Sequence, residues 1–500
     1  MLKDNYQELA EGKNLRQNLA DLRKELSDEY SRKNFDRMIG GDYHVILALL
    51  SDTDPKVRKN ACSVVGLCSP KNGLGQLMAA YRREKTLYVR PYYLKAMASY
   101  DCSSLLEELK EQELNLMMEE TSEEDQKHRS LELAEIRSLI ASYETLQKHT
   151  FVMPVISPDV ILITNRNQRE ATLSQIRLGN VKKLGAGLRV SGGDLNELLS
   201  IRTVEEYLFP VPNLTGVDGS PEQIGAQLAG SRLLAFLKKL HAEDAPFFFR
   251  IELRSNLSPD KKGAFIRKIS NALERHSGGA LRGNASDYEF ELRLILRKDE
   301  SYIALVKLFT LPDDRFSYRA GQTSESVSPV NAALVIALAK PYLKEGAQVL
   351  DPFCGVGTML VERAKAGRVG MLFATDIYGE AIRIGKENAR LAGVPVNFIH
   401  RDFFTFTHDY PFDEVISDLP RQEKDDETGE YRSVVTLYGR FFERIPTLLK
   451  DEAVLVLYTP QKEHLLAALE GKDAFLLEQE FLLNERAGTT VFILRYSKKS

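Results

Sequence analysis

Hydrophobic and polar residues follow three different patterns along this chain. Over residues 1–142 apolar positions recur every three to four residues, which predicts helices. Farther on, short apolar runs such as 247–254 alternate with amphipathic stretches such as 261–276, which predicts mixed strands and helices. From about residue 347 strand-length and helix-length segments alternate regularly, which is typical of a parallel sheet. We therefore expect three domains, at residues 1–145, 150–322 and 323–500.

The helical part contains two Val-Arg pairs, ending at Arg58 and Arg90, and each precedes an apolar helical stretch. This spacing predicts two degenerate HEAT-type repeats, in which helix pairs stack and bury a shared face. An ordinary helical bundle is the alternative. A charged helix is expected over residues 105–143, with its glutamates on a solvated face.

The middle part alternates strand and helix patterns, and we expect a ferredoxin-like α+β domain there. Phe247, Phe248 and Phe249 open a strand, and we expect them in the core because successive strand residues point to opposite faces and one face is buried. Strands are expected at residues 152–164, 189–191, 247–254, 288–297 and 302–310, helices at 231–241 and 261–276, and one element of either kind at 203–209.

The segment at residues 349–358, V-L-D-P-F-C-G-V-G-T, carries the strongest chemical signal. It predicts a strand, a tight glycine turn and a helix, whose ligand lies at the carboxyl end of the strand. A dinucleotide-binding turn has the pattern G-x-G-x-x-G, but here Leu360 stands where the third glycine would be. A phosphate-binding P-loop would need a lysine after the glycines, and the turn has none. The turn is thus suited to a nucleoside without a pyrophosphate, and Asp351 can accept hydrogen bonds from a cationic amino group. S-adenosylmethionine (SAM) fits both features.

Three further predicted strands each end in an acid, at Asp376, Asp402 and Asp418. Asp376 is placed to bind ribose hydroxyls, and Asp402 to accept from an adenine amino group that the Phe403 ring would cover. Any one of these acids alone is a common helix cap or turn residue. Their order after the glycine turn indicates a cofactor site, for which the candidates are Asp351, Phe353, Gly355, Gly357, Thr358, Asp376, Ile377, Asp402 and Phe403.

The order of these motifs resembles that of the THUMP-domain RNA methyltransferases. The resemblance is carried by D-P-F-C-G-V-G-T, Asp376, N-A-R-L-A-G-V at 388–394, R-D-F-F at 401–404, D-L-P at 418–420, and, upstream, L-P-D-D-R-F-S-Y-R at 311–319 with S-P-V-N-A-A-L at 328–334. It implies a Rossmann-like class I methyltransferase domain behind a THUMP-like RNA-binding region. It also implies SAM-dependent methylation of the exocyclic N2 amine of a guanosine in tRNA or rRNA.

The loop after the fourth strand departs from that family. The usual motif is N/D-x-P-F/Y-G, and here Asp418, Leu419 and Pro420 match while Arg421 and Gln422 replace the aromatic residue and the glycine. We expect Asp418 and the Leu419 carbonyl to hold the reacting amine, Pro420 to fix the loop, and the Arg421 plane to stack on the base. Two alternatives stay open: a catalytically silent SAM- or RNA-binding scaffold, and a methyltransferase acting on a DNA or protein amine or amide.

The amino-acid composition bears on the compartment in which the protein is expected. The 500 residues are 43% hydrophobic, without an apolar run of about 18 residues or an N-terminal signal segment, so a membrane span and secretion are not expected. The four cysteines form no C-x-x-C pair, which argues against a metal site and favours a reducing cytoplasm.

Charge gives a weaker signal for nucleic acid. The net charge of −4 does not favour RNA binding, but the middle part carries more Lys and Arg than Asp and Glu. The candidate RNA face consists of Arg250, Arg254, Lys261, Lys262, Arg267 and Lys268, with scattered solubilising charge as the alternative. The helical repeats are a candidate docking surface for a protein partner.

Overall fold

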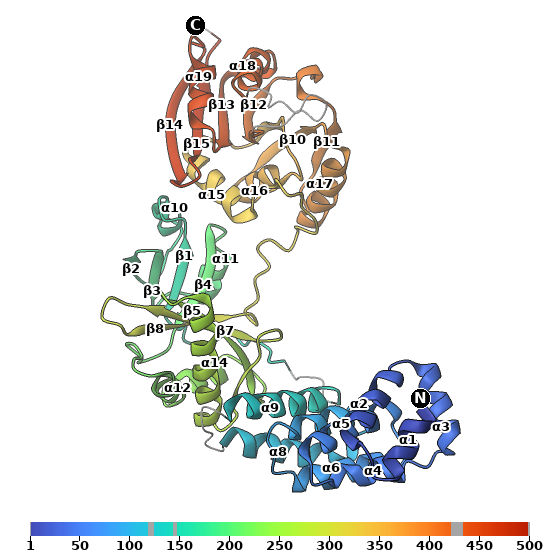
Figure 1. The fold of residues 1–500 in the computed structure, drawn as a ribbon. Helices are drawn as coiled ribbons and strands as arrows, with labels where there is room; N and C mark the ends of the chain where they lie inside the picture. Colours follow the sequence, from blue (N-terminus) through green and yellow to red (C-terminus); the bar gives the residue numbers. More distant parts are fainter. Residues whose placement is uncertain (1, 119–124, 144–147, 422–433, 499–500) are drawn as a thin grey trace.

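The computed structural model describes residues 2–118, 125–143, 148–421 and 434–498. Figure 1 shows three bodies in succession: a helical region, a middle region built on one sheet, and a C-terminal region built on another. The helical region lies beside one end of α14, and an extended segment leads from the middle region to the C-terminal region. Among the described residues, none of the helices combines the length and the apolar character needed to cross a membrane.

The helical region consists of stacked helix pairs. Helices α2, α5, α7 and α9 pack on one another in that order, and each also packs against the helix that precedes it in its pair, α1, α4, α6 and α8 respectively. The bounds are α1 Leu2–Ala10, α2 Leu15–Glu25, α3 Glu29–Ile39, α4 His44–Ala48, α5 Pro55–Cys68, α6 Gly73–Arg83, α7 Arg90–Met97, α8 Leu106–Met118 and α9 Gln126–Ala141. The assignment to HEAT-type repeats stays a prediction.

The two arginines of the Val-Arg pairs are ion-paired to the next helical layer. Arg58 donates two hydrogen bonds of 2.7 Å to the Glu84 carboxylate, and Arg90 donates one of 2.6 Å to Glu132. Glu132 is fully buried, and Glu113 is 2% exposed between Arg137 and Arg282. The expectation that the glutamates of residues 105–143 form a solvated face is therefore wrong for these two, because each is the acid of an inter-helix ion pair.

The middle region has an eight-stranded sheet with the order β2-β3-β1-β4-β8-β7-β5-β6. Strand β5 runs parallel to β6 and β7, and the other neighbours are antiparallel. The strands are β1 Val160–Thr164, β2 Asn180–Leu184, β3 Gly187–Ser191, β4 Val204–Pro210, β5 Phe247–Arg254, β6 Leu281–Gly283, β7 Phe290–Leu296 and β8 Tyr302–Leu308. The helices are α10 Arg169–Leu173, α11 Leu195–Ser200, α12 Pro221–Ala229, α13 Leu233–Lys239 and α14 Pro259–His276.

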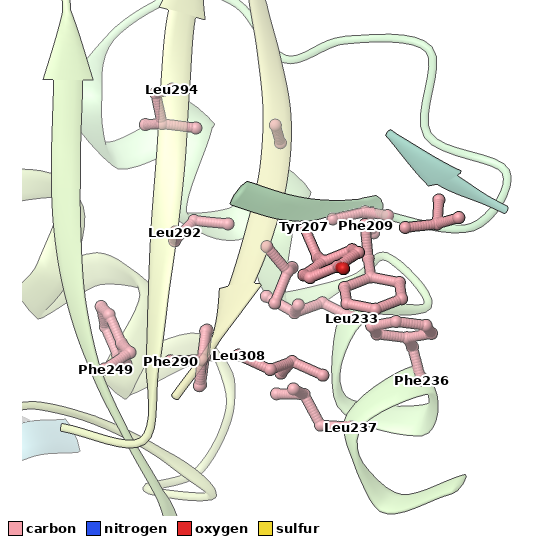
Figure 2. Close-up of a cluster of buried hydrophobic side chains, with 14 of the residues drawn as sticks. Tyr207, Phe209, Leu233, Phe236, Leu237, Phe249, Phe290, Leu292, Leu294 and Leu308 are labelled. Carbon is pink, nitrogen blue, oxygen red and sulfur yellow. The ribbon is translucent and has the colours of Figure 1, made fainter. Parts of the chain in front are cut away.

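The core of the middle region lies between this sheet and its helices. Figure 2 shows Phe249 and Phe290 side by side on neighbouring strands, with Leu233, Phe236 and Leu237 on a helix that packs against the same apolar layer. Alternate residues of β5 are buried, beginning with Phe247 and Phe249, so the expectation that these phenylalanines are core is confirmed. Phe248 faces the opposite side and is partly exposed.

Two strand predictions for the middle region need correction. The strand expected at residues 152–164 begins only at Val160, because Pro154 and Pro158 lack the backbone N–H that a ladder requires, and Val155 is fully exposed. Strand β2 was not expected, since N-V-K-K-L has little apolar alternation and lies at the edge of the sheet. The ambiguous segment at 203–209 forms strand β4.

The C-terminal region has a seven-stranded sheet with the order β11-β10-β9-β12-β13-β15-β14. Strands β9, β10, β11, β12 and β13 are all parallel. Strand β15 is antiparallel to both of its neighbours, β13 and β14. The strands are β9 Ala347–Asp351, β10 Val369–Asp376, β11 Val396–His400, β12 Phe412–Asp418, β13 Leu449–Thr459, β14 Phe475–Asn484 and β15 Thr489–Tyr496; the helices are α15 Pro329–Ala339, α16 Thr358–Ala366, α17 Gly379–Ala392, α18 Val434–Arg444 and α19 Lys462–Leu469. The carboxyl ends of the parallel strands share one edge, where ligands of such sheets bind.

The middle region contacts the C-terminal region through polar bonds. Arg202 donates two hydrogen bonds of 2.7 Å to Glu362 on α16, and the Tyr318 hydroxyl donates to the same carboxylate. Near α10, Asn165 and Gln168 donate to the backbone carbonyls at the end of β14. The bonds to Glu362 join the middle region to α16, and the bonds of Asn165 and Gln168 join it to the end of β14.

Candidate functional site

The glycine turn lies between β9 and α16 and needs glycine at two positions. Gly355 has φ +50° and Gly357 has φ +77°, in the left-handed region that residues with a Cβ rarely adopt. A Cβ on Gly357 would lie 2.8 Å from the Phe398 ring, whereas the Cβ direction of Gly355 is open. The backbone of this turn therefore comes close to whatever lies at the sheet edge.

Asp351 ends β9 and is 1% exposed. It accepts a hydrogen bond of 2.6 Å from the Ser417 hydroxyl and one of 3.2 Å from the Phe353 amide. The pKa of Asp351 is raised to about 8, mainly by burial; the two hydrogen bonds lower it, and the nearby carboxylates Asp376 and Asp418 raise it. A cation placed here would favour the ionised carboxylate.

Asp376 ends β10 on the same edge. Its two carboxylate oxygens accept from the amides of Gly355 at 2.8 Å and Tyr378 at 2.9 Å, so it fixes the glycine turn. Ile377, which follows it, is 53% exposed although it is apolar. A flat apolar ligand placed over Ile377 would cover that surface.

Asp402 and Phe403 follow β11. Asp402 is exposed and caps the short helix that starts after it, accepting from the Phe404 amide at 2.9 Å. Phe403 is 1% exposed and packs against Phe353 and Phe441 in the core. The expectation that the Phe403 ring covers a base is therefore wrong, because the ring cannot do so without leaving the core.

The loop after β12 is pinned on both sides. The Leu419 amide donates to the Tyr458 carbonyl at 2.9 Å, and the Tyr438 hydroxyl donates to the Pro420 carbonyl at 2.9 Å. Asp418 directly precedes these two residues, and its Oδ1 atom is buried with no hydrogen-bond partner among the described residues. Burial raises the pKa of Asp418 to about 7, with Arg421 lowering it and Glu325 raising it. An unpartnered buried carboxylate oxygen is an acceptor available to a substrate donor.

Arg421 is exposed at the end of this loop, and its charge acts on Asp418 and Tyr458. Gln422, the second departure from the family motif, lies outside the described residues.

A cleft of about 410 Å³ opens beside the loop, between the middle and C-terminal regions. Tyr458 lines it and is the register partner of Asp418 on the neighbouring strand. Desolvation by partial burial and the neighbouring Glu206 raise the pKa of Glu205, which lies on the middle-region side. The lining residues are Asn165, Glu205, Ser328, Val330, Asn331, Tyr458, Leu483, Asn484 and Thr489.

Several site residues were not expected from the sequence. Ser417 directly precedes the D-L-P motif, but the sequence gave no sign of its bond to Asp351. Tyr438 belongs to an amphipathic helix, Tyr458 to a buried strand and Glu205 to a different region, so spacing along the chain could not reveal them.

The six cations of the candidate RNA face do not share one surface. Arg250 and Arg254 lie on β5 among the residues that point away from the core, while Lys261, Lys262, Arg267 and Lys268 lie on α14. Helix α14 packs through Ile269 and Leu273 on the other side of the sheet, so the single face that the sequence suggested is wrong. Contact of either group with RNA stays a prediction.

Comparison with known proteins gives a partial match. Residues 319–484 match the family described as RMKL-like, methyltransferase domain (UPF0020). "Putative RNA methyltransferase YpsC" of Bacillus subtilis (strain 168) is 25% identical and the match covers 38% of this chain. The chain spans 59% of the length of that relative. Residues 319–484 are thus a methyltransferase domain, and its cofactor is SAM.

Solved structures share the fold. TrmN from Thermus thermophilus superimposes with a TM-score of 0.52 at 20% identity, over 68% of this chain and 99% of TrmN. SMU.472, solved in complex with SAH, has a TM-score of 0.51 at 14% identity, over 71% of this chain and 100% of its own. Matches of this extent are longer than the methyltransferase domain, so the shared fold extends into other parts of the chain.

The residues present fit SAM. The hydroxyl of Thr358, at the start of α16, and Asp418 Oδ1 are buried without a partner among the described residues, and both lie at the sheet edge that bears the glycine turn. The acids of this edge suit a ligand with a cationic amino group and ribose hydroxyls.

Proposed function

We propose that this chain methylates the exocyclic N2 amine of a guanosine in tRNA or rRNA. The observation that carries the proposal is the placement of Asp418. Its unpartnered carboxylate oxygen lies at the end of β12, one residue from Ser417, whose hydroxyl binds the acid of the cofactor turn. Substrate acceptor and cofactor turn are thereby held on one sheet edge. The RNA methyltransferase name of the Bacillus relative and the resemblance to THUMP-domain enzymes support RNA as the substrate.

In this proposal the cofactor supplies an activated methyl group, and the protein aligns the nucleophile. Asp418 accepts a hydrogen bond from the amine, and the pinned loop keeps the Leu419 carbonyl in place to accept a second one. These two bonds orient the nitrogen lone pair, which is otherwise delocalised into the ring. When the N–C bond forms, the methyl–sulfur bond would break with its electron pair left on sulfur, and the amine would release one proton that ionised Asp418 can accept.

The cleft beside Tyr458 gives the target base a route to Asp418. A paired guanine cannot reach a recessed carboxylate, so the base must be unpaired or flipped out of its helix. The cleft is lined by polar side chains from both regions, including Asn165 and Asn331, which can donate to and accept from a base edge. In the proposed complex the middle region therefore completes the substrate pocket.

We assign the other binding roles to residues at the carboxyl ends of the parallel strands of the C-terminal sheet. Asp351, Phe353, Gly355, Gly357, Thr358, Asp376, Ile377 and Asp402 hold the cofactor, and Asp418, Leu419, Pro420 and Arg421 hold the base. A silent scaffold is the second candidate, and Arg421 in place of an aromatic residue is the observation that favours it.

Mass spectrometry of nucleosides tests the proposal. Purified protein is incubated with labelled SAM and total RNA, and the digest is analysed for labelled N2-methylguanosine. We expect label in that nucleoside for the parent and not for Asp418→Ala, with equal SAM binding by both proteins in calorimetry. Label in DNA or protein and not in RNA would overturn the substrate assignment, and SAM binding without any transfer would identify a scaffold.

A further inference from the structure

Two aromatic rings and two cations gather on the face of the middle sheet opposite α14. The Arg250 guanidinium lies 4.3 Å from the centre of the Tyr288 ring and 5.7 Å from that of Phe309. The Lys307 ammonium lies 5.3 Å from the Phe309 ring centre, and the two rings meet edge to face at 4.9 Å. We call Arg250, Tyr288, Lys307 and Phe309 the ring–cation patch.

The sheet itself holds the patch in place. Lys307 on β8, Glu291 on β7 and Arg250 on β5 are register partners in one row across three strands. Phe309 directly follows β8, and its amide donates to the Glu289 carbonyl at 2.8 Å. A ligand bound here would therefore meet a surface whose backbone is already ordered, at a low entropic cost.

The side chains of Arg250, Lys307 and Phe309 are partly exposed to solvent. Phe309, which directly follows β8, is 46% exposed. The side chain of Arg250 is 40% exposed, whereas its partner Glu291 is 2% exposed, so the acid lies inside and the cation outside. Lys307 and Glu206 form a second pair at 2.6 Å, with exposures of 28% and 27%. Both cations of the patch are thus ion-paired, and each is at least as exposed as the acid that pairs with it.

We propose that the ring–cation patch binds single-stranded RNA by stacking an unpaired base on the Phe309 ring. This inference rests on the proposed RNA substrate and assigns a second contact far along the chain from Asp418. Every nucleobase offers a flat face to a ring or a guanidinium, and the neighbouring phosphates are attracted by Arg250 and Lys307. A duplex presents its phosphates but no free base faces, so the patch selects unpaired RNA.

The test uses the full chain and a fluorescent, mixed-sequence single strand of about 12 nucleotides, within the usual range of single-strand sites. Phe309→Leu keeps an apolar side chain but removes the flat ring, and we expect about fivefold weaker binding or more. Phe309→Trp keeps the ring and should bind at least as tightly as the parent. Tyr30→Leu removes a more exposed ring, 77% exposed on the helical region, and should change nothing.

The same variants are measured on a duplex of the same sequence and in the methyl-transfer assay. Loss of single-strand binding in Phe309→Leu with unchanged duplex binding supports the inference. Parent-like single-strand binding by Phe309→Leu, or an equal loss on duplex, overturns it whatever the transfer assay shows. If the binding pattern holds and the parent transfers no methyl group to RNA, the patch stands and the proposed reaction fails. Circular dichroism of each variant checks that the fold is kept.

Discussion

Ser417 donates a 2.6 Å hydrogen bond to Asp351, and this bond joins the strand that carries the proposed substrate acid to the strand that carries the cofactor turn. Both side chains are almost completely buried. The hydroxyl lowers the pKa of an acid that burial would otherwise raise still further. The bond thus favours the charged form of Asp351 that a cationic cofactor needs.

Ser417→Ala should weaken SAM binding at pH 7 by about fivefold, corresponding to about 1 kcal/mol for the lost hydrogen bond. Because the pKa of Asp351 is raised to about 8, the ionised fraction grows as the pH rises from 6 to 8. The SAM affinity of the parent should therefore increase over that interval. Calorimetry across the pH series measures both effects, with Asp351→Asn as the control that removes the titration. A flat profile for the parent would show that Asp351 does not bind the cation.

Methyl transfer should also depend on the ionisation of Asp418. Its pKa is raised to about 7, and only the ionised carboxylate is free to accept both the hydrogen bond and the proton of the amine. The rate should rise through pH 7 and level off above it. Asp418→Asn should lower the rate about 100-fold or more, the usual cost of losing a preorganised polar group. The pH profile of kcat/KM checks this, and equal rates at pH 6 and pH 8 would exclude the role.

Arg421 distinguishes an enzyme from a scaffold. If its plane stacks on the target base, Arg421→Ala should reduce methyl transfer by about tenfold, as expected for a stacking contact, while Arg421→Phe and Arg421→Tyr should retain it. Transfer of labelled methyl to total RNA is the measurement, with SAM affinity as the control. Transfer that is absent in the parent and appears in Arg421→Phe would show that the natural chain is silent.

Gly357→Ala should damage the cofactor turn in particular. A left-handed alanine costs about 1 kcal/mol, and the added methyl would also meet the Phe398 ring at 2.8 Å. Gly393→Ala is the matched control: its φ is +67° at the end of α17, but the added methyl meets no atom within 4 Å. Both variants should lower the free energy of unfolding, and Gly357→Ala should also lose SAM affinity in calorimetry. Equal SAM binding by both would contradict the close approach of the turn to the cofactor.

The buried ion pair between Arg90 and Glu132 should stabilise the helical region strongly. Removing one partner leaves an uncompensated buried charge, so Glu132→Ala should cost about 3 to 5 kcal/mol. Arg82 and Glu108 form the matched surface pair, with side chains 55% and 30% exposed, and Glu108→Ala should cost less than about 1 kcal/mol. Urea unfolding of the full chain, followed by helical circular dichroism, compares the two. Similar losses would show that the buried pair contributes no more than a surface one.

Much of the secondary structure can be predicted from the pattern of apolar residues and glycines along the chain. The strand at 247–254 has the bounds expected from its apolar run, because strand length and the residues that end it are set by neighbouring positions. The glycine turn likewise follows from sequence, since the conformations of Gly355 and Gly357 are ones that few other residues adopt. The sequence by itself therefore determined the order of strand ends and the acids that follow them.

Tertiary structure decided which of these side chains meet, and in what surroundings. Phe403 directly follows the candidate acid Asp402, yet packing against Phe441 carries its ring into the core. The candidate RNA face divided because β5 and α14 turn their cations to opposite sides of one sheet. The bond from Ser417 to Asp351 spans 66 residues, and Tyr458 meets the middle region across a cleft. Such contacts depend on how segments that are distant in sequence pack against one another. The periodicity of apolar residues predicts only local secondary structure, so it does not predict that packing.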